Sequence, residues 1–506
     1  MRKRAVLILK NEYRDSVFLM RVNDMVEKYE GVIRAAVMMG TEANKDLMKE
    51  AGLYDEKADE AGPNDLVIIV EAQDEESAER ALDYAKSLVY KTEKEEKKEE
   101  QNYLSIRSAV SFEPDIDLVF ISTPGEYAYR EAMRAVLLNK HVMVFSSNVP
   151  LEKEKKLKET ADKRGLLVMG PDAGTAIIRG VGLGFFNVVK EGPVGIVGAA
   201  GTGIQVVSSL LDLAGSGITA AIGTGSNDVK DYIGGITLKR GLKLLGAHKK
   251  TKVITIVSKP PSESVARETV ELVKSLEKPT VVNFIGYEGK DEDNVSFAYT
   301  LEDASKKSYA LAEGKEFKLP TWTDEKEEDE ARENLKPEQA YIRGLFSGGT
   351  ICYEAQNILK KKGVKVYSNS PLEKELEIGG FSESKADTMI DMGAEEFVRG
   401  VPHPMIDFRF RKERIIKEAK DKSVAVILFD IVLGYGANMD PAGEISEAIR
   451  KARDMNKSLA FVASVVGTKG DPQGLDSQVA KLKSLGVLVY PSTTKAVEVA
   501  FSIAKR

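Results

Sequence analysis

The chain has 506 residues, which is too many for a single hydrophobic core, so three or four domains are expected. Charged residues make up 30% and hydrophobic residues 42% of the chain, the balance of a soluble globular protein. The net charge of -6 gives no reason to expect a nucleic acid as a partner, and no stretch approaches the roughly 20 consecutive apolar residues of a membrane span.

The single cysteine, Cys352, excludes an internal disulfide framework and fits a reducing cytoplasm. Because the chain has one cysteine and three histidines, a zinc site of the Cys/His type is not expected, and no other metal site is predicted. We therefore expect a cytoplasmic protein that holds no metal.

Residues 1–90 alternate strand and helix patterns and predict a small α+β domain, with a ferredoxin-like arrangement as one option. Its expected strands cover 5–9, 33–39 and 66–71, and its expected helices cover 16–29, 43–51 and 78–89. Residues 91–101 are a run of charge, which is typical of a solvated linker or of a helix extension.

Residues 104–190 and 191–322 predict parallel sheets, because short apolar strands alternate there with helical crossovers. The expected strands cover 118–122, 141–145, 166–169, 194–197, 219–222, 253–257 and 280–285, and the helices cover 126–138, 152–164, 204–213 and 264–276. An acidic linker at 323–334 leads to a last α/β domain at 337–506, with strands expected at 341–346, 364–367, 424–429, 458–464 and 487–490. The fold class is therefore α/β, with a small α+β domain at the N-terminal end.

Two glycine-rich loops each stand between an expected strand and an expected helix. Residues 198–203 have the sequence Gly-Ala-Ala-Gly-Thr-Gly, and residues 347–350 have the sequence Ser-Gly-Gly-Thr. A helix start offers free backbone N–H groups and a positive dipole end, so it suits an anion. Neither loop is a Walker A sequence, and for either loop alone a plain tight turn explains the glycines equally well. The pair favours one phosphate or carboxylate held between two facing helices.

Several residues are predicted to act at this site. The predicted phosphate-binding residues lie in the two loops and are Gly198, Gly201, Thr202, Gly203, Ser347, Gly348, Gly349 and Thr350. Lys259 follows a strand and is predicted to neutralise anionic charge, with an ordinary exposed loop lysine as the alternative. Asn227, Asp228 and Asp430 are predicted to bind a small carboxylate substrate, although a plain turn and a helix cap explain them equally well.

Arg399 and His403 border a proline-rich loop that is predicted to bind the substrate carboxylate or to shuttle a proton. Together with Lys259 they form the predicted catalytic set. The other two histidines, His141 and His248, are expected to be structural, because one starts a buried strand and the other lies in a surface-like turn.

The order of several short motifs resembles the FdrA-type proteins of the succinyl-CoA synthetase (acyl-CoA ligase) superfamily. The motifs are Val-Met-Met-Gly-Thr at 37–41, Val-Met-Gly-Pro-Asp at 168–172, Val-Ser-Lys-Pro-Pro at 257–261, Gly-Leu-Phe-Ser-Gly-Gly-Thr at 344–350, Gly-Val-Pro-His-Pro-Met-Ile-Asp at 400–407, and the segments 195–205 and 221–223. The resemblance implies a Rossmann-like domain of CoA-binding type at 104–190 and flavodoxin-like ligase domains at 191–322 and 337–506. It also implies that one helix from each flavodoxin-like domain converges on a phosphate.

The chain departs from the ligases of this superfamily in three respects. The ligases carry their energy on a phosphohistidine, in a segment that here covers 286–292 and contains no histidine. Residues 103–114 lack the glycine loop that would hold a nucleotide, and no segment resembles an ATP-grasp domain. These departures argue against ATP-driven thioester formation by this chain alone and leave CoA in doubt as a cofactor.

FdrA-type proteins are linked to oxamate carbamoyltransferase activity in allantoin use, which is part of purine catabolism. Oxalurate and phosphate then give oxamate and carbamoyl phosphate, so phosphate is a substrate and no cofactor is needed. The resemblance implies a transferase that works with partner protein subunits in an oligomer. Two alternatives stay open. One is an acyl-CoA ligase-like enzyme that takes its nucleotide domain and phosphorylatable group from another chain, and the other is a non-catalytic, anion-sensing scaffold subunit.

Overall fold

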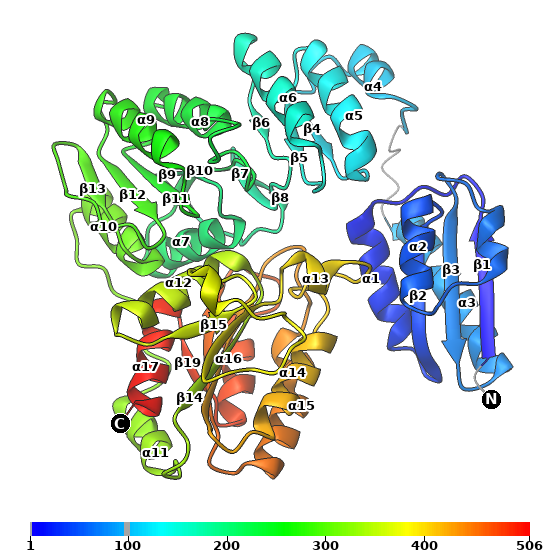
Figure 1. The fold of residues 1–506 in the computed structure, drawn as a ribbon. Coiled ribbons are helices and arrows are strands. Elements are labelled where there is room, and N and C mark those ends of the chain that lie inside the picture. Colours follow the sequence, from blue (N-terminus) through cyan, green and yellow to red (C-terminus); the bar gives the residue numbers. More distant parts are fainter. Residues whose placement is uncertain (1–2, 96–101, 506) are drawn as a thin grey trace. The chain divides into compact units, whose positions relative to one another are not determined.

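The computed structural model describes residues 3–95 and 102–505, so the second half of the charge run lies outside the described residues. The chain divides into two units, which are Met1–Ala109 with Val398–Asp407, and Val110–Phe397 with Phe408–Arg506 (Figure 1). Among the described helices, none is both long and apolar enough to cross a membrane.

The N-terminal unit contains a small α+β layer fold, as predicted. Its antiparallel sheet has the strand order β1-β3-β2 and consists of β1 (Lys3–Leu9), β2 (Val32–Met39) and β3 (Leu66–Ala72). Its helices are α1 (Ser16–Glu27), α2 (Glu42–Glu50), the 3-10 helix η1 (Glu56–Glu60) and α3 (Glu75–Glu95). All residues of the central strand β3 are buried, because α1 and α3 cover one face of the sheet while α2 and η1 cover the other. A ferredoxin-like fold has four strands, whereas the described residues of this sheet form three.

The chain continues through α4 (Ile106–Phe112) into a small parallel sheet, as the strand pattern predicts. Its elements are β4 (Leu118–Ile121), α5 (Gly125–Leu137), β5 (His141–Val144), α6 (Leu151–Lys163) and β6 (Val168–Met169). The next two strands, β7 (Thr175–Ile178) and β8 (Val181–Gly184), form a hairpin that was not predicted. Arg179 and Gly180 form its turn with φ values of 51° and 78°, the backbone that a two-residue hairpin requires.

The first large sheet has the strand order β13-β12-β11-β9-β10-β7-β8. Its parallel strands are β9 (Glu191–Gly198), β10 (Ile218–Gly223), β11 (Val253–Ser258), β12 (Thr280–Phe284) and β13 (Val295–Phe297). Numbered from β9, these five strands run 2-1-3-4-5, which is the flavodoxin-like order. The helices α7 (Gly201–Leu213) and α10 (Leu301–Glu313) pair on one face, and α8 (Ile236–Ala247) and α9 (Glu263–Lys274) pair on the other (Figure 1).

The second large sheet is parallel throughout, with the order β15-β16-β14-β17-β18-β19. Its strands are β14 (Tyr341–Phe346), β15 (Val366–Ser368), β16 (Asp387–Asp391), β17 (Val424–Val432), β18 (Ala460–Val466) and β19 (Leu488–Tyr490). Strand β16 was not predicted, and it separates β15 from β14. Its helices are α12 (Gly349–Lys361), α13 (Glu395–Val398), α14 (Arg409–Ala419), α15 (Pro441–Met455), α16 (Leu475–Ser484) and α17 (Thr493–Ala504), with the 3-10 helix η2 (Lys374–Leu376).

The acidic segment expected to be a linker at 323–334 is instead a helix, α11 (Glu325–Glu333). A capping box explains the difference. The Asp324 side chain accepts the N–H of Glu327, and the Glu327 side chain accepts the N–H of Asp324, so two donors of the helix start are satisfied. Three glutamates in the first turn also stabilise the helix, because their negative charges lie at the positive end of the helix dipole.

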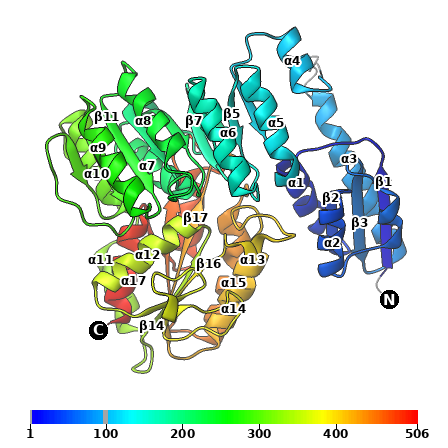
Figure 2. The same cartoon turned by 45° about the horizontal axis from the view of Figure 1, so that its top comes forward.

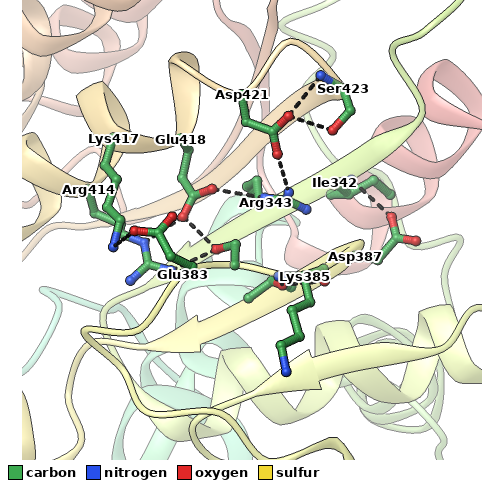
Figure 3. A network of polar contacts seen from close by, with 12 residues as sticks. Ile342, Arg343, Glu383, Lys385, Asp387, Arg414, Lys417, Glu418, Asp421 and Ser423 are labelled. Atoms are coloured by element: carbon green, nitrogen blue, oxygen red, sulfur yellow. Dashed lines mark hydrogen bonds and ion pairs between the residues drawn. The ribbon is translucent and has the colours of Figure 1, made fainter.

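A buried ionic network holds β14 against α14 (Figure 3). Arg343, on β14, donates from Nε to Glu418 at 2.9 Å and from Nη2 to Asp421 at 2.9 Å. Glu418 also accepts from Arg414 and, at 2.6 Å, from the Ser384 hydroxyl. The network therefore fixes the strand whose carboxyl end leads into residues 347–350.

Hydrogen bonds around Asn187 and Asp471 tie the two large sheets together. Asn187 donates to the carbonyl oxygen of Leu433 at 2.9 Å and to the Asp471 carboxylate at 2.8 Å. The other oxygen of Asp471 accepts the N–H of Val188 at 2.7 Å. Gln205, on α7, donates to the Asn187 side-chain oxygen at 3.1 Å, so α7 is linked to the same network.

A second buried ionic cluster joins α6 to the start of α8. The Lys158 ammonium lies 2.9 Å from the Glu154 carboxylate and 2.8 Å from the Asp228 carboxylate, and all three side chains have no exposed surface. Asp228 also accepts the N–H groups of Thr237 and Leu238 at 3.1 and 2.8 Å, so it caps α8. The cluster thus attaches the small parallel sheet to the first large one.

Lys158→Ala is expected to destabilise the protein by about 3–5 kcal/mol, because it leaves two buried carboxylates without their cation. Lys250→Ala is the control, since Lys250 forms an exposed pair with Glu191 and its loss should change stability little. Urea unfolding followed by circular dichroism measures both variants. Equal midpoints for the two variants would contradict a stabilising role for the cluster.

Candidate functional site

The starts of α7 and α12 lie directly against each other, and the two helices adjoin in both views (Figure 1, Figure 2). A Cβ atom placed on Gly348 would lie 2.6 Å from the Thr202 hydroxyl oxygen. A Cβ atom placed on Gly203 would lie 2.8 Å from the Thr350 methyl carbon. Each loop therefore needs a glycine where the threonine of the other helix approaches it, and the facing arrangement on which the anion prediction depends is present.

Both helix starts keep their first N–H groups free of side-chain caps. The residues that precede the helices, Ala200 and Gly348, form no side-chain cap hydrogen bond. The first backbone bonds of the two helices run from Ile204 to Ala200 at 2.8 Å and from Cys352 to Gly348 at 3.2 Å. The amides before Ile204 and Cys352 therefore have no partner within their helices and are available to a ligand.

Further donors converge at the same place. Lys259 directly follows β11, and its ammonium nitrogen lies 3.1 Å from the position that a Cβ on Gly349 would take. Within the described residues, neither this ammonium nor the Thr202 and Thr350 hydroxyls have a hydrogen bond or an ion pair. A half-buried cation beside two positive helix ends is unfavourable unless negative charge lies close to it.

The sheet topology explains why these groups meet. In the first large sheet the strand order reverses between β9 and β11, and the loops after these two strands carry Gly201 and Lys259. Open α/β sheets bind their ligands outside the carboxyl ends of the strands at such a reversal. A glycine is also required at position 198 for steric reasons, because a Cβ there would overlap the carbonyl oxygen of Val257 on β11.

Two carboxylates lie beneath the second loop. The buried Asp430 accepts the N–H of Ser347 at 2.7 Å, and Arg411 donates to the Ser347 hydroxyl at 2.6 Å and to the Asp430 carbonyl oxygen at 2.6 Å. The N–H and the hydroxyl group of Ser347 therefore both form hydrogen bonds that anchor the loop. The second carboxylate is Asp391, which ends β16 and lies beside Gly349.

Burial raises the pKa of Asp391 from its ordinary value to about 6, although the Lys259 charge and the N–H of Gly393 act in the opposite direction. Neither Asp391 nor Arg411 was predicted. Asp391 lies on an unpredicted strand, and Arg411 belongs to the charged sequence Arg-Phe-Arg-Lys-Glu-Arg at 409–414, which is typical of a surface helix.

The other predicted residues contact structural neighbours. Both oxygens of Asp228 are engaged by Lys158 and the start of α8, and Asn227 donates to Glu154 at 3.2 Å. Arg399 and His403 belong to the N-terminal unit, where Arg399 lies 3.5 Å from the Glu50 carboxylate. Substrate binding by Asn227, Asp228 and Asp430, and catalysis by Arg399 and His403, stay predictions.

The loop after β12, which the resemblance predicts to match the phosphohistidine segment of the ligases, packs along α12. A Cβ on Gly286 would overlap the Asn357 side chain, and Glu288 pairs with Lys361 near the end of the helix. Tyr287 lies edge-on to Phe284, with ring centroids 6.2 Å apart. The contacts of this loop are therefore made in the second half of α12.

Family models cover most of the chain. The CoA-ligase model matches residues 345–503, the model named "CoA binding domain" matches 189–286, and the model named "AllF, heavy metal-associated domain" matches 1–104. The CoA-binding match thus falls on the range expected to be the first flavodoxin-like domain. The uncharacterized protein YahF of Escherichia coli (strain K12) is 38% identical over 496 residues, which are 97% of this chain and 96% of YahF. The chain belongs to the FdrA-type family of the succinyl-CoA synthetase superfamily.

Other similarities are partial. The alpha subunit of succinate–CoA ligase (ADP-forming) from Methanothermobacter thermautotrophicus is 28% identical over 123 residues, which are 24% of the FdrA-type chain and 42% of that subunit. The solved apo form of the dinucleotide-forming acetyl-coenzyme A synthetase 1 of Ca. Korarchaeum cryptofilum aligns with 78% of this chain and 84% of its own. Its sequence identity is 17% and its TM-score is 0.33.

The name of the N-terminal family model implies a metal, and the residues of this chain do not fit one. Residues 1–104 contain neither cysteine nor histidine, so they lack the thiolate and imidazole groups that commonly bind such metals. In the described parts of the chain, no group of three or more His, Cys, Asp or Glu side chains could hold a metal ion.

Gly348→Ala is expected to lower the affinity for inorganic phosphate at least tenfold, because its Cβ would push the Thr202 hydroxyl out of the site. Gly174→Ala is the control, because a Cβ on Gly174 would meet no atom within 4 Å. Isothermal titration with phosphate compares the two variants. Equal affinities would mean that the facing helix starts do not hold the anion.

Cys352 is expected to resist alkylation in the folded protein. Its thiol is fully buried within α12, and burial raises its pKa far above the ordinary value, although a helix start could have lowered it. Iodoacetamide should modify it slowly in buffer and rapidly in urea, as followed by mass spectrometry. Rapid labelling of the folded chain would instead indicate a reactive thiol.

Proposed function

We propose that this protein is the phosphate-binding subunit of an oxamate carbamoyltransferase. It transfers the carbamoyl group of oxalurate to phosphate, giving oxamate and carbamoyl phosphate, and it catalyses the reverse transfer. The supporting observation is the convergence of two uncapped helix starts on Lys259. Two helix dipoles and an ammonium group together stabilise the charge of a phosphate dianion.

The chemistry of this transfer suits such a site. A phosphate oxygen attacks a carbamoyl carbon, and negative charge develops on the carbonyl oxygen as the tetrahedral intermediate forms. Fixed N–H and hydroxyl donors stabilise that charge without reorganisation, and holding phosphate beside the carbonyl group supplies proximity. The Thr202 hydroxyl, which lies 2.6 Å from the position of a Cβ on Gly348, is one proposed donor, and the Thr350 hydroxyl is the other. The reaction has no phosphohistidine step, which agrees with a segment 286–292 that contains no histidine.

The resemblance to FdrA-type proteins supports partner subunits, a cytoplasmic location and a place in allantoin breakdown. The substrate is then a small carboxylate. Lys259, Arg399 and His403 are the proposed groups for its anchoring and for proton transfer, as the sequence pattern predicts.

A second candidate is an acyl-CoA ligase-like activity, which the CoA-ligase and CoA-binding family models favour. The amides at the start of α7 could hold a phosphate group of CoA in the same way as they would hold inorganic phosphate, so the helix start fits both ligands. In this case another chain supplies the phosphorylatable group and the nucleotide site.

The full chain, purified with its partner subunits, is expected to form carbamoyl phosphate from oxalurate and inorganic phosphate without CoA or ATP. Gly349→Val should lower this turnover by about 10²-fold, because small displacements at a reacting centre cost that much. The reason is that a Cβ on Gly349 would lie 2.8 Å from the Asp391 carboxylate.

Coupled detection of carbamoyl phosphate measures turnover, and titration with CoA tests the second candidate. The protein would be a ligase instead if it bound CoA and formed a thioester with ATP but showed no phosphate-dependent turnover of oxalurate. If turnover survives bulky substitutions at both Gly201 and Gly349, this chain is a non-catalytic scaffold subunit of the complex.

A further inference from the structure

One carboxylate oxygen of Asp391 lies at the anion site and has no hydrogen-bond partner among the described residues. Oδ1 accepts the N–H of Gly393 at 2.9 Å. Oδ2 lies 2.8 Å from the position that a Cβ on Gly349 would take, and no group in the described parts of the chain forms a hydrogen bond or an ion pair with it. The residue is only 6% exposed. Because this oxygen lies beside the first turn of α12 and none of the described groups bonds to it, it is available to a ligand held at the helix start.

The other charged or titratable groups that face Asp391 are Lys259, Asp430, Glu396 and Cys352. Asp430 is held by Ser347, and Glu396 accepts the N–H of Gly380 at 3.1 Å and an Asn369 N–H at 2.8 Å. Cys352 is a buried neutral thiol, and Lys259 is the cation of the group. Asp430 also has an oxygen without a hydrogen-bond partner, Oδ2, but this residue is wholly buried and lies 3.7 Å from the Arg411 guanidinium. Asp391 is therefore the acid of this cluster whose unpartnered oxygen lies beside the start of α12.

The proposed reaction needs one proton to change place. A phosphate oxygen bonds to the ureido carbonyl carbon of oxalurate, and the bond from that carbon to the inner nitrogen breaks. This nitrogen is a poor leaving group unless it gains a proton, while the hydrogenphosphate dianion gives up its proton when it becomes carbamoyl phosphate. The proton lost by phosphate thus balances the proton gained by oxamate.

We propose that Asp391 carries this proton, an inference that rests on the proposed function. The protonated carboxyl group gives its proton to the leaving nitrogen and then takes the remaining phosphoryl O–H proton, so it ends each turnover as it began. Lys259 holds the phosphate beside it. One carboxyl group placed next to the bound phosphate serves both transfers, since donor and acceptor are used in sequence.

The charge state of Asp391 gives this role a pH dependence. Burial keeps the carboxyl group protonated to a higher pH than an ordinary aspartic acid, with a pKa of about 6. The protonated fraction falls as the pH rises through that value, so the contribution of Asp391 to the rate falls with it. Phosphate also titrates near neutral pH, and the ratio of wild-type to variant rates removes this effect.

The test compares wild type with Asp391→Asn, each purified with the partner subunits, at pH 5.5 to 8 and saturating oxalurate. An asparagine oxygen can still accept the N–H of Gly393, so the variant keeps the local structure. We expect kcat to fall by about 10²–10⁴-fold at the acid end, with the KM for phosphate changed only a few-fold. The wild-type to variant ratio should decrease as the pH rises above about 6.

Asp440→Asn is the matched control, because Asp440 also follows a strand of the second large sheet but caps α15 through the N–H of Gly443. Its kcat and its pH profile should match those of wild type. If Asp391→Asn does not fold, as judged by near-ultraviolet circular dichroism, Asp391→Ser takes its place, and the ratio of wild-type kcat to variant kcat is measured in the same way.

A variant with near-normal kcat, or a ratio that does not change with pH, would overturn the role of Asp391 while leaving the transferase intact. Absence of phosphate-dependent oxalurate turnover in the wild-type complex would overturn the proposed function, and the proton-transfer role with it.

Discussion

The positive ends of α7 and α12 face each other, and the rest of the second unit is arranged around this electrostatic constraint. Each helix start carries roughly half an elementary charge, and the Lys259 ammonium adds a full one. These charges repel unless negative groups lie close to them. Asp391 supplies such a group from beneath the second loop, whereas the charge of Asp430 is paired with that of Arg411. The cluster therefore keeps an excess of positive charge, which favours an anion.

The supports of the site come from parts of the chain far apart in the sequence. Helix α14 supports the second loop through residues near both of its ends. Arg411 near its start fixes Ser347, and Glu418 near its end binds Arg343 on the strand that leads to Ser347. One rigid element therefore sets both the strand and the loop that follows it. A buried Arg–Glu pair of this kind stabilises little by itself, but loss of either partner would leave an unpaired charge in the interior.

The sequence revealed those parts of the fold that depend on local patterns. The strand-loop-helix units at 194–213 and 341–361 were predicted because apolar strands, glycines and amphipathic helices follow one another directly. Asp391 was missed because its strand, Asp-Thr-Met-Ile-Asp, has only two strongly apolar residues and is buried by its neighbours in the sheet. Arg411 was missed because burial of a guanidinium group depends on Asp430, a partner nineteen residues away in the chain. The acidic composition of residues 323–334 predicts a linker, whereas the capping box formed by Asp324 and Glu327 stabilises the helix α11.

The cross-links around Asn187 and Asp471 have a consequence for variation within the family. They join the two α/β halves through side chains, so the spacing of the two helix starts does not depend on the covalent connection between α10 and α11. Variation in the length of that connection is expected before Trp322, because Trp322 packs against the core of the second sheet and the Thr323 hydroxyl bonds to the backbone of Val489. Relatives that encode the two halves as separate polypeptides would have to keep these polar contacts together with the packing of α7 on α12 and of α10 on α17.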